Sequence, residues 1–465
     1  MTKRNPFKLL PLTLAIALVP TLASAEDLNQ IYDLARQNDP VLSGAEAQRL
    51  STAEGVDQAT SALLPQISAT FDFGDSRITR YNSGIGQDQE GNFGVRVTTS
   101  ESDGRSTTLG GQLTQSIIDF SKWTARKAAK ELALRGDSQY VQAEQDLAIR
   151  VATAYFAVLT AEDTLTFSQA EEKALNRQLD QAQQRFEVGL SAITDVNEAK
   201  AQHDSARAAS ILAQNSLEDA REALREITGK EPGALARLRA ELPLNEPVPN
   251  DMQAWVDRAL AENPALKAQE HAVEAAAANI KTARSGHLPT LSGTVSYQRN
   301  PSWGDGSSSQ NPTPEDIHSN SRDTNRSIGL RLSVPIFSGG YTQSRVRQAV
   351  YDRDAATDLL EQNKRALIRT TRLNFRSVVA GISEVEARKQ AVVSANSALE
   401  ATQAGFEVGT RTIVDVLLSQ RQLYQAQRDH SQARHSFVLN QLRLRQSAGN
   451  VGPNDLKEVN ALLVE

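Results

Sequence analysis

The chain has 465 residues, a formal net charge of −6 at pH 7, a pI near 5.7 and no cysteine. Acidic and basic residues are nearly balanced and no basic patch stands out, which argues against a nucleic-acid partner. Without cysteine the chain forms no disulfides and carries no lipid on an N-terminal cysteine. Only 39% of the residues are hydrophobic and 5% are aromatic, a composition that suits thin helical layers better than a thick globular core.

The first 25 residues predict a secretory signal peptide. Basic residues precede an apolar run from Leu9 to Val19, and small residues ending at Ala25 provide a cleavage site. The apolar run is too short to remain as a membrane anchor, and no later stretch approaches 18 uncharged apolar residues. We therefore expect an exported chain without transmembrane helices.

Short motifs recur at a spacing of 220 to 224 residues. Residues 38–42 (NDPVL) recur as residues 262–266 (ENPAL), and residues 64–68 (LPQIS) recur as residues 288–292 (LPTLS). Farther along, the segment RFEVGLSAITDV, which starts at Arg185, recurs as AGFEVGTRTIVDV, which starts at Ala404. Such long-range self-similarity indicates a tandem duplication.

The duplication divides the chain into segments. We expect the signal peptide at residues 1–25, a first repeat at 26–230, a proline-rich linker at 231–250, a second repeat at 251–449 and a C-terminal segment at 450–465. Each repeat should contain a helix, a β-hairpin and a long helical hairpin.

Long proline-free stretches predict four long helices at residues 121–187, 191–228, 341–407 and 411–448. Proline costs about 3 kcal/mol and glycine about 1 kcal/mol inside a helix, so their near absence is a strong signal. Apolar and alanine positions recur at spacings of three and four, which favours antiparallel helical hairpins. The same pattern also fits an ordinary coiled coil without special activity.

Four short segments alternate between apolar and polar residues and predict strands at about residues 66–73, 109–114, 291–298 and 327–334. We expect long polar loops between them, over residues 74–105 and 299–325. A soluble half-buried sheet shows the same alternation, but the helices are already paired with one another, so a membrane is the better apolar cover. Four strands cannot close a barrel, which needs about eight, so we infer an oligomeric barrel.

Five segments together resemble the TolC family of outer-membrane export ducts from Gram-negative bacteria. They are residues 113–123 (LTQSIIDFSKW), 153–159 (TAYFAVL), 192–196 (AITDV), 333–340 (SVPIFSGG) and 412–416 (TIVDV). The resemblance covers essentially the whole mature chain in order. It implies a homotrimer whose chains each give four transmembrane strands to a twelve-stranded β-barrel, continuous with a long periplasmic barrel of α-helical coiled-coil hairpins. The linker and the C-terminal segment would lie in an equatorial belt.

The same resemblance implies a function in export. Such a protein is the outer-membrane exit duct of tripartite multidrug efflux or of type I protein secretion, and it opens at its periplasmic helical tips. Its partners would be a periplasmic adaptor (membrane fusion) protein, an inner-membrane efflux pump or ABC transporter, and outer-membrane lipid. We expect no enzymatic activity, no cofactor and no metal, because the six histidines show no metal-site spacing.

The resemblance also assigns residues at the tips. Asp415 matches an aspartate that rings the closed pore, whereas Leu418 stands where the family usually has a second aspartate. Thr194, Asp195 and Arg411 match residues that latch the closed tips together. Phe406 stands where the family usually has a tyrosine of the same latch, and it lacks the hydroxyl. The tips that receive the adaptor would be formed by Val188, Gly189, Leu190, Val408, Gly409 and Thr410.

Two other classes of protein remain open on the sequence. One is a periplasmic coiled-coil scaffold or adaptor that never enters a membrane, and the other is an autonomous porin. The length of the helices disfavours the porin, and the lipid-like faces of the alternating strands disfavour the scaffold. For any single polar residue at the tips, a solvated charge at a helix turn is the simplest alternative.

Overall fold

The computed structural model describes residues 25–87, 90–308 and 315–464. All of the predicted signal peptide except Ala25 lies outside these residues. The chain forms two compact units. We call one the sheet unit, which comprises Ser43–Ala143 and Leu260–Arg369, and the other the tip unit, which comprises Glu144–Ala259, the described residues up to Leu42 and those from Thr370 onward.

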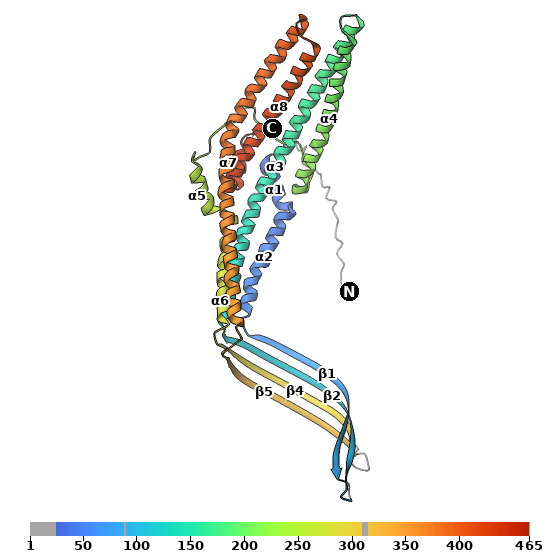
Figure 1. Ribbon diagram of the computed structural model, residues 1–465, viewed down its shortest axis with the longest axis vertical. Coiled ribbons are helices and arrows are strands. Elements are labelled where there is room, and N and C mark those ends of the chain that lie inside the picture. The colour runs from blue at the N-terminus through green and yellow to red at the C-terminus, as the bar shows by residue number, and fades with distance from the viewer. Residues whose placement is uncertain (1–24, 88–89, 309–314, 465) are drawn as a thin grey trace, which may run out of the picture. The chain divides into compact units, whose positions relative to one another are not determined.

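Four antiparallel strands form the sheet of the sheet unit (Figure 1). They are β1 (Gln66–Gln87), β2 (Phe93–Ile118), β4 (Thr290–Ser308) and β5 (Glu315–Ser333). Their order is β1-β2-β4-β5, so the hairpins of the two repeats lie side by side through β2 and β4. Strands β1 and β5 are the edges, and neither has a second neighbour among the described residues.

The strands are much longer than the sequence predicted. The expected loops at residues 74–105 and 299–325 are wrong, because β1 pairs with β2 from Gln66–Thr114 to Gln87–Phe93, and β4 pairs with β5 along its whole length. Polar side chains do not prevent backbone hydrogen bonding between strands, and polar pairs across neighbouring strands also stabilise a sheet. Arg77 and Asp103 form such a pair at 2.6 Å, and the hydroxyls of Ser302 and Ser321 lie 2.9 Å apart.

Apolar side chains of this sheet lack cover within the chain. Ile67 is 78% exposed and Ile328 is 86% exposed, and the aromatic rings of Phe71 and Phe73 are exposed as well. An uncovered apolar face and two open edges are features that soluble monomers avoid. The sheet therefore requires further strands and an apolar surrounding.

The long helices agree with the prediction. Helix α3 spans Phe120–Glu187 and α4 spans Ile193–Thr228, while α7 spans Tyr341–Glu407 and α8 spans Ile413–Ser447. The shorter helices are α1 (Leu28–Asn38), α2 (Pro40–Ser61), α5 (Met252–Glu262), α6 (Pro264–Ser285) and α9 (Pro453–Asn460). Within the described part of the chain, no helix combines the length and apolar character needed to cross a membrane.

Both repeats begin their second helix in the same way. Asp39 caps α2 by accepting the amide of Leu42 at 2.8 Å, and Asn263 caps α6 by accepting the amide of Leu266 at 3.2 Å. A proline follows each cap at the first helical position, where its missing N–H costs nothing. The duplicated Asn-Pro and Asp-Pro motifs are thus helix-start signals.

A small second sheet joins distant parts of the tip unit. Strand β3 (Arg237–Leu238) pairs with β6 (Leu463–Val464), and Glu26 forms an isolated bridge with Leu235. The hydroxyl of the buried Tyr155 donates to the carbonyl oxygen of Ala236 at 2.7 Å. Sequence reasoning missed this sheet, because two-residue strands carry no periodicity.

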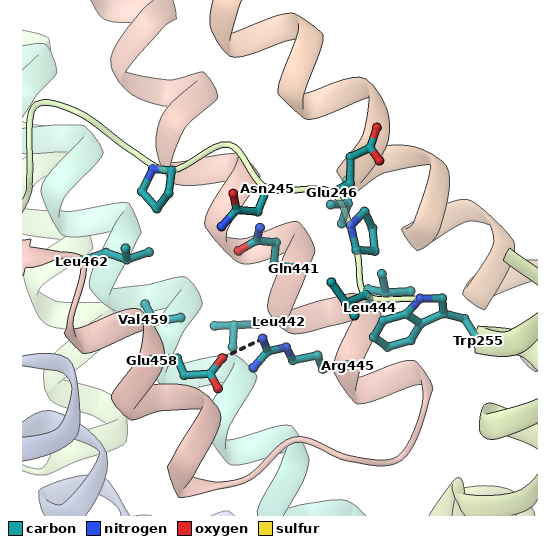
Figure 2. Close-up of a pocket in the computed structure, with 14 residues that line it drawn as sticks. Asn245, Glu246, Trp255, Gln441, Leu442, Leu444, Arg445, Glu458, Val459 and Leu462 are labelled. Atoms are coloured by element: carbon teal, nitrogen blue, oxygen red, sulfur yellow. Dashed lines mark ion pairs between the residues drawn. The ribbon is translucent and has the colours of Figure 1, made fainter. Parts of the chain in front are cut away.

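The linker between the repeats covers a cavity of about 310 Å³ in the tip unit (Figure 2). Linker residues Asn245 and Glu246 lie on one side, and residues of α8 and α9 lie on the other. Arg445 of α8 forms an ion pair with Glu458 of α9 at 2.7 Å and a second with Asp455. These pairs hold the C-terminal segment against α8.

Asp39 also forms a buried ion pair. Its side chain is 2% exposed, and its Oδ2 lies 2.6 Å from an Nη atom of Arg150 on α3. Burial by itself raises the pKa of Asp39, but hydrogen bonds from Arg150 and from the amides of Leu42 and Val41 outweigh it and hold the pKa below the ordinary 3.8.

Replacing Arg150 by Met should destabilise the chain by about 3 kcal/mol at pH 7, because a buried carboxylate loses its partner while the arginine was itself partly hydrated. The carboxylate contributes stability above its ordinary pKa, and this contribution disappears as the pH falls through the lower pKa of the folded state. The loss should therefore shrink between pH 7 and pH 3 in urea denaturation followed by circular dichroism. Arg150→Lys, which keeps the charge, is the control. A loss independent of pH would contradict this assignment.

Candidate functional site at the helical tips

Each long helical hairpin ends in a short turn, and both turns lie at the same end of the tip unit (Figure 1). The first joins α3 to α4 between Glu187 and Ile193, and the second joins α7 to α8 between Glu407 and Ile413. Both turns consist of five residues that carry predicted site positions. The tips therefore carry positions expected for the gate and for docking.

The two turns share one backbone geometry. Gly189 has φ +75° and Gly409 has φ +80°, a left-handed conformation that side chains other than glycine rarely adopt. In the first turn the amide of Leu190 donates to the carbonyl of Arg185, and the amide of Gly189 donates to the carbonyl of Phe186. In the second turn the amide of Thr410 donates to the carbonyl of Gly405, and the amide of Gly409 donates to the carbonyl of Phe406. These paired bonds define a Schellman motif, which satisfies the last carbonyls of each helix.

The turns place apolar side chains in solvent. Val188 and Leu190 are each 69% exposed, and Val408 is 75% exposed. Because the Schellman bonds fix the backbone, these side chains form a preorganised apolar surface on each tip. Such an exposed group of apolar residues is typical of an interaction site.

The helices that follow the turns begin differently. Thr412 and Asp415 form a capping box on α8, in which the Thr412 hydroxyl accepts the Asp415 amide at 3.3 Å and the Asp415 carboxylate accepts the Thr412 amide at 3.0 Å. The equivalent residues on α4 are Ala192 and Asp195, and Ala192 provides no side-chain cap. Bonds from the backbone amide and then the hydroxyl of Thr412 lower the pKa of Asp415 below 3.8.

Phe406 lies between the two hairpins. Its ring packs against one apolar cluster drawn from α3, α4 and α8, and against a second drawn from α7 and α8. The guanidinium carbon of Arg185 on α3 lies 5.0 Å from the centroid of the ring. This contact joins the first hairpin to the second, and the sequence analysis did not foresee it.

The other predicted latch residues are not joined within one chain. Thr194 and Arg411 are exposed and Asp195 is half-buried. In the described part of the chain, no hydrogen bond or ion pair links their side chains to one another. Arg411 instead lies near Asp415, whose pKa it helps to lower. Leu418, three residues after Asp415, is exposed.

Residues 25–87, 90–308 and 315–464 include no group of three or more histidine, aspartate or glutamate side chains that could hold a metal ion. The tips offer hydrogen-bonding groups, one engaged carboxylate and apolar surface. This chemistry suits contact and gating.

The chain matches the family described as outer membrane efflux protein, first over residues 31–230 and again over residues 255–450. It is 41% identical to the outer membrane protein TolC of Vibrio cholerae, over 98% of each chain. It is 38% identical to the outer membrane protein TolC of Escherichia coli, over 98% of this chain and 89% of the relative. It is 28% identical to the alkaline protease secretion protein AprF of Pseudomonas aeruginosa, over 93% of this chain and 86% of the relative.

Solved structures share the fold. The crystal structures of CusC align with a TM-score of 0.71 at 16% identity, covering 92% of this chain and 93% of that one. The outer membrane protein VceC of Vibrio cholerae aligns with a TM-score of 0.69 at 19% identity, covering 91% and 96%.

The strands, the long helical hairpins and these relatives define a TolC-like outer-membrane exit duct of the kind that serves efflux and type I secretion. The chain belongs to the outer membrane efflux protein family, and its two family matches confirm the tandem repeat. It resides in the outer membrane of a Gram-negative bacterium and has a large periplasmic helical part. The periplasmic scaffold is not favoured, because the family is one of channel and transport proteins.

Removing the Thr412 hydroxyl should loosen the start of α8. Loss of a threonine cap costs about 1 kcal/mol, so Thr412→Ala should speed hydrogen exchange of the Asp415 amide about fivefold and raise the pKa of the Asp415 carboxyl towards 3.8. Exchange measured by mass spectrometry tests the first effect. Thr412→Ser keeps the hydroxyl and should behave as wild type, whereas Ala192→Thr should slow exchange at Asp195. Unaltered exchange in Thr412→Ala would exclude the cap.

Proposed function

We propose that the chain works as a homotrimeric exit duct whose periplasmic end opens when an adaptor and an inner-membrane pump dock on the helical tips. The observation that carries the trimer is the four-stranded sheet with two open edges and exposed apolar side chains. In a bilayer every backbone group must be bonded, so the open β1 and β5 edges require partner strands. Three chains would give twelve strands, which is enough to close a barrel around water.

Both pump classes remain candidate partners. The names of the relatives include an alkaline protease secretion protein and a solvent efflux pump outer membrane protein. We propose that this chain likewise accepts cargo from an ABC transporter or from an efflux pump through a periplasmic adaptor. The duct itself supplies no energy, which comes from the inner-membrane partner.

We assign adaptor docking to the two Schellman turns. Val188, Leu190 and Val408 provide apolar contact area, while Gly189, Gly409 and Thr410 set the shape of the turns. A rigid and mainly apolar surface of this kind suits a helical hairpin of a partner. Exposure of these side chains in the free chain supports the assignment.

We place the pore constriction at Asp415 and the latch at Thr194, Asp195, Phe406 and Arg411. Three Asp415 carboxylates around the axis would favour cations, and the exposed Leu418 would add an apolar ring one turn away. The side chain of Arg411 is exposed and forms no ion pair with the described residues of its own chain. A neighbouring chain of the trimer can therefore supply its partner. Asp195 is the natural candidate, because it takes no part in a capping box at the start of α4.

We also propose that the mature duct begins after residue 25. Its repeats would span residues 26–230 and 251–449, and residues 231–250 and 450–465 would form the equatorial belt. The cavity beside the linker and the ion pairs of Arg445 support a close association of these two segments.

Arg411→Ser should shift the duct towards an open state. If Arg411 latches neighbouring chains by contacts of about 1 kcal/mol, its loss raises the open probability about threefold to tenfold. Single-channel recording in planar bilayers measures this change, and native mass spectrometry verifies that the variant is still a trimer. Arg421→Ser, the same change on an exposed position of α8, is the control. Equal open probability in Arg411→Ser and wild type would refute the latch, and a monomeric wild type would refute the duct.

Asp415→Asn should remove charge from the constriction and still accept bonds at the start of α8. We expect the reversal potential in a salt gradient to move towards zero and block by multivalent cations to weaken, because the acidic ring is lost. Asp219→Asn, which removes an exposed carboxylate from α4, should leave selectivity unaltered. Undiminished selectivity in Asp415→Asn would place the filter elsewhere.

A further inference from the structure

We propose that Arg185 is a positioning residue of the gate: its guanidinium lies over the Phe406 ring and ties the second hairpin to the first within one chain. The proposal rests on the proposed function, because it assigns a new member to the latch at the tips.

The contact has the geometry of a cation–π interaction. The Arg185 guanidinium carbon lies 5.0 Å from the Phe406 centroid, inside the range of about 6 Å in which such pairs attract. Arg185 is half-buried on α3, and Phe406 is half-buried on α7. Among the described residues, Arg185 forms no ion pair. Within the described chain, the Phe406 ring is therefore the partner of its charge.

One atom of Arg185 strengthens this assignment. Its Nε is buried and has no hydrogen-bond partner among the described residues. A buried guanidinium N–H without a partner carries a cost, so the side chain is not held in this position by hydrogen bonding at Nε. Packing of its stem and attraction to the ring are the interactions that keep it there, and partial removal from water strengthens the attraction.

Comparison of the two repeats shows that the contact has no reciprocal counterpart, in which a residue of the second hairpin would cover the ring of Phe186. The residue equivalent to Phe406 in the first repeat is Phe186, which is 42% exposed, and no arginine or lysine of the described residues lies over its ring. The residue equivalent to Arg185 in the second repeat is Gly405. A Cβ atom at Gly405 would lie 2.8 Å from Cγ of Arg411, so glycine leaves room for the Arg411 stem. The repeats have thus diverged at this position into two complementary halves of one contact.

Phe406 is well placed to transmit the effect. Its ring packs against two apolar clusters of the tip unit, one with Leu417 of α8 and Leu179 of α3, and one with Val416 of α8 and Leu399 of α7. A movement of the second hairpin away from the first would separate the ring from Arg185 and from one cluster at the same time. Arg185 therefore favours the arrangement in which the hairpins lie together.

Channel recording on four variants tests the pair. Arg185→Met keeps the apolar stem and removes the charge, and Phe406→Leu keeps an apolar group and removes the ring. Each should raise the open probability about twofold to fivefold, and the double variant should open no more than the stronger single one, because both changes remove the same contact. Phe406→Tyr keeps the ring and should not raise the open probability. The controls are Phe186→Leu, the equivalent position of the first repeat, and Arg207→Met, which removes an exposed charge from the first hairpin; neither should open the duct.

Hydrogen exchange supplies a readout that does not depend on the position of the gate. Arg185→Met lies in the first hairpin, yet it should speed exchange at the second tip, residues 404–412, whereas Arg207→Met should not. If Arg411→Ser opens the duct and Arg185→Met does not, the proposal for Arg185 fails while the gate stands. If exchange responds and none of the tip variants alters the open probability, the contact is real and the gate lies elsewhere. Multiplicative effects in the double variant, or no effect at the second tip, would overturn the proposal.

Discussion

Unpaired backbone at the edges of the four-stranded sheet is the constraint on which the rest of the structure depends. Each edge strand presents N–H and C=O groups that neither water nor lipid can satisfy inside a bilayer. The chain provides β1 and β5 as edges and leaves their apolar residues exposed. The proposed assembly of several chains would resolve both problems at once.

The tandem repeat uses one set of backbone signals twice and varies the side chains around them. Both copies start their second helix with a cap and a proline, and both end the first helix of their long hairpin with a Schellman motif that contains a glycine. The polar side chains beside these signals differ between the copies. Asp39 pairs with Arg150 where the second copy has the neutral Asn263, and Thr412 caps α8 where the first copy has Ala192.

A gate requires contacts that are individually weak. Capping of α8, the approach of Arg185 to Phe406 and the packing of the Phe406 ring each contribute on the order of 1 kcal/mol. A pair with a buried carboxylate, such as Asp39–Arg150, would not suit such contacts, because separating the partners costs several times more. The tip unit places its strong pair near the start of α2 and its weak contacts at the turns.

The sequence by itself determined the repeat, the long helices and the family. Absence of proline fixed helices α3 and α7 almost to the residue, because helix propensity is local and accumulates over many residues. Strand length was underestimated, because polar strands such as residues 74–87 lack the alternation that marks a buried face, and only their partners reveal them. The contact of Arg185 with Phe406, more than 200 residues away along the chain, was decided by tertiary structure alone, since it depends on which faces of two hairpins pack together.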